Sequence, residues 1–282
     1  EAAKQADIVV MVAGEEAVLS GEAHCRADLS LPGAQTEMLK ALKATGKPVV
    51  LVVMAGRPLT ISQEVDLADA TLFMFHPGTM GGPALAKLLA GEAVPSGKLP
   101  MSFPRMAGQE PMYYNHNNSG RPASNIVLMD DIDLEAGQTS TGCTGYYLDA
   151  GDGPAFPFGY GLSYTTFAYG DVRLSSATMD KAGEIEVACT ISNTGNVEAS
   201  ETAQLYVRDL VGSLTRPGRE LKGFEKITLK PGESRDVKFT LKASDLAFHT
   251  SSETTVVEPG DFQVWVSTDS ASGTPVKFTV TE

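Results

Sequence analysis

The spacing of apolar residues changes partway along the chain and divides the sequence into regions of two fold types. Up to about residue 104, apolar runs of strand length alternate with helical stretches, which is typical of parallel α/β structure. From about residue 164, apolar and polar residues alternate with a period of two, as in antiparallel strands with one buried face. We therefore predict an α/β domain at residues 1–104 and an all-β domain at 164–282, joined by a linker at 105–163.

The α/β half contains three apolar runs that have the length of buried strands. They predict parallel strands at residues 8–13, 49–54 and 71–75, with helices at 34–45 and 83–90. A sheet of this size is small for one that helices cover on both faces, so we expect edge strands before residue 1. The first half is therefore predicted to be part of a parallel α/β sandwich domain.

Four stretches of the second half alternate apolar and polar residues and are separated by turn sequences rich in Pro, Gly and Asn. These stretches are residues 184–191, 202–207, 235–241 and 262–266. They predict an antiparallel β-sandwich of about seven strands, close in size to a fibronectin type III domain. Cys189 lies on the apolar phase of the first stretch and is predicted to be a core thiol.

Composition excludes several classes of partner. The 282 residues carry a net charge of −13 without a Lys/Arg cluster, so phosphate backbones would be repelled and nucleic acid is not expected to bind. The longest apolar stretch, residues 48–55, is too short to cross a bilayer, so no membrane span is expected. Three cysteines cannot all pair and their spacing fits no zinc pattern, so we expect neither metal nor cofactor.

Several short motifs, in one order along the chain, resemble the β-glucosidases of glycoside hydrolase family 3. They are Gly14-Glu15; Ser20-Gly-Glu-Ala with Arg26, Asp28 and Leu31-Pro-Gly-x-Gln35; the run from Gly46-Lys-Pro to Arg57-Pro58; Pro77-Gly-x-x-Gly-Gly; Pro95-Ser-Gly-Lys-Leu-Pro; Tyr113-Tyr-Asn-His-x-Asn; Phe156-Pro-Phe-Gly-Tyr-Gly; Leu221-Lys-Gly-Phe-Glu-Lys-Ile; and Leu229-Lys-Pro-Gly-Glu. Together they cover essentially the whole chain.

The resemblance implies a retaining, exo-acting hydrolase that removes terminal β-D-glucosyl residues from β-glucosides or short β-glucans. It also implies that the Asp nucleophile lies on an N-terminal (β/α)₈ barrel, which this sequence does not include, and that the all-β half is a fibronectin type III-like domain. Two alternatives remain open: a β-xylosidase of the same family, and a non-catalytic accessory fragment that stabilises a barrel or binds glycan. Export to the periplasm or the outside is a further expectation from the family.

Glu22 is the predicted acid/base. A retaining glycosidase needs two carboxyl groups about 5 to 5.5 Å apart, one of which protonates the leaving oxygen while the other attacks the anomeric carbon. Glu22 follows the first predicted strand in a loop, where open α/β sheets place residues that contact ligands, and Gly21 lets the backbone bend there. Glu15 and Glu16 also follow this strand and are competitors, although Glu16 reads as a solvated side chain.

Other residues are expected around the sugar or in support of the loop. Arg26 and Asp28 are predicted to brace the loop by an ion pair or by capping turns, and Glu15 to hold Arg26 or a loop amide. His24 is a candidate sugar contact, and Arg57 either contacts sugar or forms a salt bridge within the domain. In the linker, Tyr114, His116 and Asn117 either bind sugar or join the domains. Residues 125–144 are predicted to reach a second subunit, giving a homodimer, or the rim of the active site.

Overall fold

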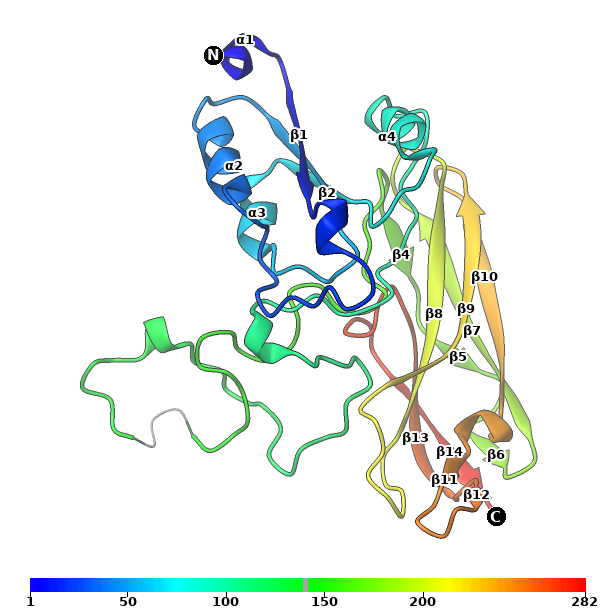
Figure 1. Ribbon diagram of the computed structural model, residues 1–282. Helices are drawn as coiled ribbons and strands as arrows, with labels where there is room; N and C mark the ends of the chain where they lie inside the picture. The colour runs from blue at the N-terminus through cyan, green and yellow to red at the C-terminus, as the bar shows by residue number, and fades with distance from the viewer. Residues whose placement is uncertain (139–141) are drawn as a thin grey trace. The chain divides into compact units, whose positions relative to one another are not determined.

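The computed structural model describes residues 1–138 and 142–282 and contains two compact units (Figure 1). The first unit comprises residues 1–90, 102–112 and 153–156, and the second comprises residues 91–101, 113–152 and 157–282. The chain therefore passes between the two units more than once. In the part of the chain described, no helix is long and apolar enough to cross a membrane.

The first unit is built on a parallel sheet of three strands in the order β1-β2-β3 (Figure 1). The strands are β1 (Val9–Gly14), β2 (Val49–Met54) and β3 (Ala70–Phe73). Val9 pairs with Val49, and Val50 pairs with Ala70. Strands β1 and β2 consist mainly of valine and other apolar residues, and β3 has Thr71 between apolar neighbours. The three predicted strands and their parallel arrangement are confirmed.

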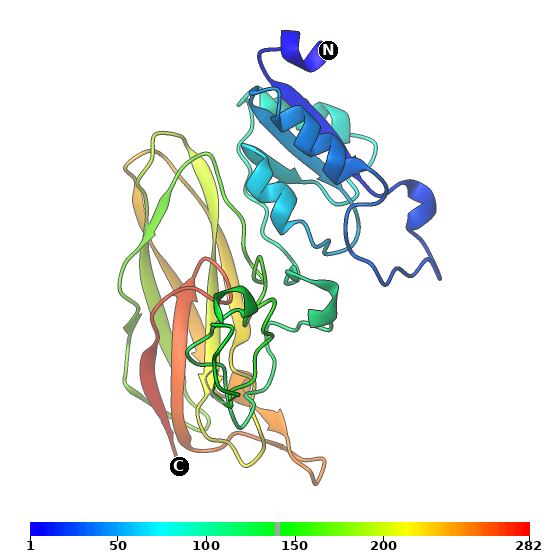
Figure 2. The ribbon, with the colours of Figure 1, turned by 90° about the vertical axis from the view of Figure 1, so that its left-hand side faces the viewer.

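Two helices lie together on one face of this sheet (Figures 1 and 2). They are α2 (Gln35–Lys43), which was predicted, and α3 (Ser62–Leu67), which was not. Leu39 of α2 is fully buried in a core with strand residues such as Leu51 and Val53. The remaining helices of this unit are α1 (Ala2–Gln5), the 3₁₀ turns η1 (Ala17–Leu19) and η2 (Ala107–Gln109), and the predicted helix α4 (Gly81–Leu89).

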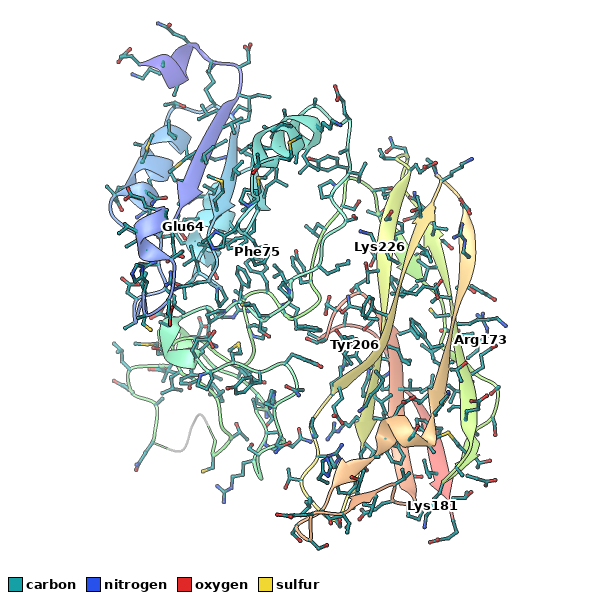
Figure 3. The ribbon with its side chains drawn as sticks, turned by 45° about the vertical axis from the view of Figure 1, so that its right-hand side comes forward. Glu64, Phe75, Arg173, Lys181, Tyr206 and Lys226 are labelled. Atoms are coloured by element: carbon teal, nitrogen blue, oxygen red, sulfur yellow. The ribbon has the colours of Figure 1, made fainter. Side chains whose placement is uncertain are left out.

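The short helix α3 escaped prediction because its buried position carries an acid. Glu64 is only 4% exposed and accepts a hydrogen bond from the Thr36 hydroxyl at 2.5 Å. A six-residue helix with a polar residue on its buried face shows no apolar period. In the same unit, Phe73 packs edge-on against Phe75 and Phe103, with ring centroids 4.8 and 4.9 Å away; Figure 3 labels Glu64 and Phe75.

The second unit is a β-sandwich whose sheets face each other (Figure 2). One sheet has the order β6-β14-β13-β8-β9; the other has the order β10-β7-β4, with β5 also on β7, and β11 pairs with β12. The strands are β4 (Phe167–Tyr169), β5 (Arg173–Leu174), β6 (Thr178–Asp180), β7 (Glu184–Asn193), β8 (Ala199–Asp209), β9 (Glu220–Leu229), β10 (Ser234–Lys242), β11 (Phe248–His249), β12 (Thr255–Val256), β13 (Gly260–Ser267) and β14 (Val276–Thr281). The described residues of this unit also form the 3₁₀ turns η3 (Met129–Asp131) and η4 (Ala243–Leu246).

The four strands predicted from alternation are confirmed as β7, β8, β10 and β13. The expectation of a wholly antiparallel sandwich is wrong at one edge, where β6 pairs with β14 in parallel. Strand β9 gave no period-two signal because its middle is open to water, with Phe224 69% exposed. The side chains facing the core alternate as predicted, and Cys189 is fully buried among them. Burial raises the pKa of the Cys189 thiol.

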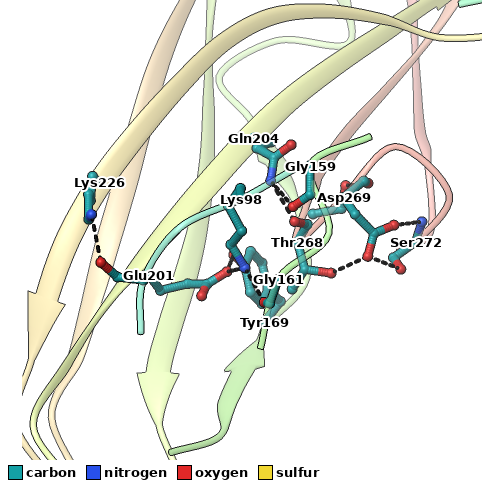
Figure 4. Close-up of polar contacts among 12 residues, drawn as sticks. Lys98, Gly159, Gly161, Tyr169, Glu201, Gln204, Lys226, Thr268, Asp269 and Ser272 are labelled. Atoms are coloured by element: carbon teal, nitrogen blue, oxygen red, sulfur yellow. Dashed lines mark hydrogen bonds and ion pairs between the residues drawn. The ribbon is translucent and has the colours of Figure 1, made fainter. Parts of the chain in front are cut away.

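A buried polar cluster lies at the edge of the sandwich core (Figure 4). Glu201 of β8 is 4% exposed; it accepts a hydrogen bond from the Tyr169 hydroxyl at 2.9 Å and pairs with the Lys98 ammonium at 3.0 Å. Lys98 also donates to the Gly161 carbonyl at 2.9 Å. Burial, and then the charge of Glu201, raise the pKa of Tyr169. We call Glu201, Lys98 and Tyr169 the sandwich cluster; it holds residues 91–101 and the start of the β domain together within this unit.

Candidate active site

The carboxyl end of β1 is fixed by a glycine that no other residue can replace without strain. Gly14 has φ of 133°, and a Cβ placed there would lie 1.9 Å from the Met54 carbonyl oxygen. The side chain of Gln35 holds the same peptide from the other side: its Oε1 accepts from the Gly14 N–H at 2.7 Å and its Nε2 donates to the Gly14 carbonyl at 2.8 Å. The residue that leaves this strand therefore has a fixed starting position.

Glu15, the next residue, is the acceptor of two arginines. Its side chain is fully buried, and one oxygen, Oε1, accepts from Arg26 and from Arg57, each at 2.7 Å. The other oxygen, Oε2, is buried and has no hydrogen-bond partner among the described residues. Glu15 thus holds Arg26, as expected, and Arg57 takes the salt-bridge alternative of its two predicted roles. We call Glu15, Arg26 and Arg57 the arginine node.

Besides binding Glu15, both arginines donate hydrogen bonds to backbone carbonyls of the loop that follows. Arg57 donates through its second terminal nitrogen to the His24 carbonyl, and Arg26 donates to the Ser30 carbonyl at 3.0 Å. Asp28 caps the end of the loop by accepting from the Ser30 N–H at 2.8 Å. This hydrogen bond lowers the pKa of Asp28. The bracing predicted for Arg26 and Asp28 is therefore present as an ion pair and a capping turn.

Glu22 lies on a turn within this braced loop. The His24 N–H donates to the Gly21 carbonyl at 3.2 Å, which closes a turn with Glu22 and Ala23 at its centre. Gly21 has φ of 138° and Ala23 has φ of 64°, a left-handed conformation that is uncommon for a residue other than glycine. Glu22 and His24 are both exposed. The arrangement leaves a carboxyl group on a bent, tied segment at the carboxyl end of a parallel sheet, where it can give or take a proton.

The predicted linker residues lie in the second unit and are tied to the β domain. Tyr114 stacks on Phe158 with ring centroids 4.3 Å apart, and its hydroxyl accepts from the Leu221 N–H at 3.1 Å. The His116 carbonyl accepts from the Gly218 N–H at 3.0 Å, and Asn117 forms a β-bridge with Pro217. These contacts tie the Tyr114 ring and the backbone of His116 and Asn117 to the β domain within this unit, and the His116 and Asn117 side chains are exposed.

One contributor to the site was not singled out from the sequence. Gln35 ends the Leu-Pro-Gly-x-Gln motif, and its side chain fixes the peptide before Glu15. A polar residue two positions after Leu-Pro-Gly, at the start of a helix, was the available signal.

Among residues 1–138 and 142–282, no cluster of three or more His, Cys, Asp or Glu side chains is arranged to hold a metal ion. The predicted contact segment 125–144 includes positions 139–141, which lie outside the described residues.

Comparison with known proteins agrees with a glycosidase α/β domain joined to a β-sandwich. Residues 1–164 match the glycosyl hydrolase family 3 C-terminal domain, and residues 201–270 match the fibronectin type III-like domain. The chain belongs to glycoside hydrolase family 3, since the first of these matches covers more than half of it. The resemblance seen in the motifs is thereby confirmed.

Individual relatives include both β-glucosidases and β-xylosidases. The periplasmic beta-glucosidase of Salmonella typhimurium is 46% identical over 96% of the chain, and a putative beta-xylosidase of Formosa agariphila is 39% identical over 95%. The crystal structure of a beta-glucosidase from Listeria innocua with gluconolactone superposes with a TM-score of 0.91, at 35% identity over 100% of the chain. The chain covers 34%, 33% and 37% of these three proteins, about a third of their length.

Proposed function

We propose that this chain supplies the acid/base of a retaining, exo-acting β-glucosidase and that Glu22 is that residue. One observation carries the proposal: Glu22 is an exposed carboxyl on a braced turn just beyond the carboxyl end of β1. Ligands of open α/β sheets bind at this edge of the strands. Glu15 is fully buried beneath two arginines, and Glu16 precedes the 3₁₀ turn η1, outside the segment that the arginines brace. The nucleophile is expected on the barrel that precedes this region in the full-length enzyme.

The proposed reaction has two steps that use Glu22 in opposite protonation states. In the first, the Glu22 carboxylic acid gives its proton to the glycosidic oxygen as a barrel carboxylate attacks the anomeric carbon. The bond to the leaving alcohol breaks and a glycosyl-enzyme forms. In the second, the Glu22 carboxylate takes a proton from water, and the water oxygen attacks the anomeric carbon. Glucose is then released with retained configuration, and the nucleophile is regenerated.

Terminal β-D-glucosyl groups of β-glucosides and short β-glucans are the proposed substrates. β-Xylosides are the second candidate, because two of the relatives from Formosa agariphila are named as β-xylosidases. Comparing kcat/KM for 4-nitrophenyl β-glucoside and β-xyloside in the full-length enzyme separates these two. Export to the periplasm is proposed because one relative is named as periplasmic. The 282-residue chain alone should not hydrolyse either substrate, because it supplies one carboxyl of the pair.

The test of Glu22 is its replacement by alanine in the full-length enzyme. Loss of proton donation should lower kcat/KM for cellobiose by about 10²- to 10⁴-fold, and should scarcely affect 2,4-dinitrophenyl β-glucoside, whose leaving group needs no proton. Azide should raise kcat on the dinitrophenyl substrate by replacing water and should yield β-glucosyl azide. Glu16→Ala, an exposed neighbour, is the matched control and should show neither effect. Equal losses on both substrates without azide rescue would rule out Glu22 as acid/base.

A further inference from the structure

We propose that Glu15 is a positioning residue which, through Arg26 and Arg57, holds the turn of Glu22 in the geometry needed for proton transfer. The inference rests on the proposed role of Glu22 and adds residues that act through it. Glu15 leaves the fixed end of β1, and its carboxylate is fully buried. It therefore lies between the rigid sheet and the loop and is not placed to touch substrate.

The arginine node links one anchored oxygen to two points of the loop backbone. Glu15 Oε1 receives both guanidinium groups at 2.7 Å, and each guanidinium uses another nitrogen on a loop carbonyl. The Arg57 contact is at His24, the closing residue of the turn that contains Glu22, and the Arg26 contact is at Ser30, where the loop ends. Because guanidinium is planar and donates in fixed directions, it transmits the position of the carboxylate to the carbonyls.

The loop has little else to order it. From residue 20 to residue 28 the chain contains no helix or strand, and all but Ser20 and Arg26 of these residues are exposed. An exposed segment without apolar contacts keeps its backbone entropy unless polar contacts restrain it. The Glu22 side chain makes no hydrogen bond to other described residues, so its position depends on the backbone on either side. The arginine node supplies the restraint on the side toward His24.

Glu15→Gln and Arg57→Lys should each remove part of this restraint while changing little volume. Glutamine keeps the shape of Glu15 without its charge; lysine keeps the charge of Arg57 but cannot reach both Glu15 and the His24 carbonyl as a fork does. A displacement of about 1 Å in a reacting group can cost about 10²-fold. We therefore expect kcat/KM for cellobiose to fall by about 10- to 100-fold in either variant, a smaller loss than in Glu22→Ala.

The experiment compares leaving groups in the full-length enzyme, well below the unfolding temperature of each variant. If Glu15 acts through Glu22, the loss should be large for cellobiose and nearly absent for 2,4-dinitrophenyl β-glucoside, and azide should partly restore kcat on the latter. A role in folding alone would instead lower the activity on both substrates together, which would overturn the inference, as would unchanged kinetics. Glu16→Gln is the control for removing a negative charge from this loop.

Glu22→Ala is measured in parallel so that the two proposals can fail separately. If Glu22→Ala shows the leaving-group signature and both node variants do not, only the positioning role is wrong. If Glu22→Ala itself lacks the signature, the proposed acid/base is wrong and the positioning role is overturned with it. If Glu15→Gln does not fold, Arg57→Lys still tests the positioning role. This variant is expected to fold because Glu15 keeps two cationic partners, Arg26 and the new lysine.

Discussion

The two units each contain a buried glutamate with cationic partners, but the partners lead to different kinds of structure. Glu15 in the first unit reaches, through two arginines, the backbone of an exposed loop. Glu201 in the second unit, with a side chain 5% exposed, pairs with Lys98 and Tyr169 beside a core of apolar strands. The same chemistry therefore orders a loop that has no core of its own in one place, and joins segments that are already packed in the other.

This difference predicts which property each glutamate controls. Removing one member of a buried ion pair leaves the other charge without a partner in a poorly solvated place, and the cost appears as lost stability. Where the cationic partners also bind the backbone of an exposed loop, the first effect is on the position of that loop. We therefore expect stability to report on the sandwich cluster and leaving-group dependence to report on the arginine node.

The largest predicted effect on stability is that of Glu201→Ala. Lys98, 12% exposed, and the Tyr169 hydroxyl would lose their shared acceptor, which should lower the free energy of unfolding of the second unit by about 3–5 kcal/mol. Trp265 is the single tryptophan of the chain and is 5% exposed in this unit, so its fluorescence during urea unfolding reports the change. Glu198→Ala, an exposed neighbour, is the control. A loss under about 1 kcal/mol would place Glu201 with ordinary surface pairs.

The next prediction separates the two glutamates by replacing whole clusters. The triple variant Lys98→Met, Tyr169→Phe and Glu201→Leu should recover most of the stability lost in Glu201→Ala, because well-packed apolar residues often match a buried ion pair. The same urea titration checks it. A triple variant as unstable as Glu201→Ala would show that the polar contacts themselves stabilise the sandwich.

Replacing Glu15, Arg26 and Arg57 together by apolar residues should, in contrast, not restore kcat/KM for cellobiose. The two hydrogen bonds from the arginines to loop carbonyls require N–H donors, which apolar side chains lack.

The strands and helices that could be predicted from the sequence are those whose buried positions hold apolar residues. The valine run at residues 49–54 and the alternation at 184–191 both form strands, since hydrophobic period and burial coincide there. It missed α3, whose buried position is Glu64, and β9, whose Phe224 faces water. In both cases tertiary contacts decided the structure, and those contacts join residues far apart in the chain.

The candidate site was predictable only where its residues are close in the sequence. A glutamate after a strand end in a Ser-Gly-Glu-Ala loop was visible in the sequence, and so was a link between Glu15 and Arg26, which lie 11 residues apart. The contact of Arg57 with the same Glu15 oxygen was not visible, because it joins residues 42 apart in the sequence that follow two different strands. The sequence position of Glu201 does carry a signal: it occupies the core phase of β8 with Ala203 and Leu205, where an acid needs a buried partner.

Gln35→Ala tests whether the arginine node depends on a fixed strand end. The variant loses the two hydrogen bonds that hold the Gly14 peptide, worth about 1–3 kcal/mol together at about 0.5–1.5 kcal/mol each. Amide exchange of the peptide covering residues 9–20 should become faster, and kcat/KM for cellobiose should fall more than that for the dinitrophenyl substrate. Gln63→Ala, at an exposed position of α3, is the control. Unchanged exchange at Gly14 would show that strand pairing alone fixes this peptide.

The smallest predicted effect on stability concerns an exposed ion pair in the first unit, Lys43 and Asp69, which serves as a reference for the two buried glutamates. Asp69 Oδ2 accepts from the Lys43 ammonium at 2.6 Å and from the Val49 N–H at 2.7 Å. The bond from Lys43, followed by that from Val49, lowers the pKa of Asp69. Its folded pKa is therefore below the unfolded value of about 3.9, so its stabilising effect is complete above that pH and is lost as pH falls through the folded pKa.

Asp69→Asn should accordingly be less stable than the parent chain near pH 7, and this difference should shrink as the pH is lowered below about 4. Thermal unfolding of both proteins between pH 7 and pH 3 measures it. Lys43→Met is the matched control: it removes the larger cause of the pKa shift but keeps the bond from Val49, so its pH dependence should lie between those of the other two. Added salt should reduce the contribution of Lys43, because exposed pairs are screened, and should leave the sandwich cluster nearly unaffected. A difference between the two proteins that stayed constant down to pH 3 would show that Asp69 acts without its charge.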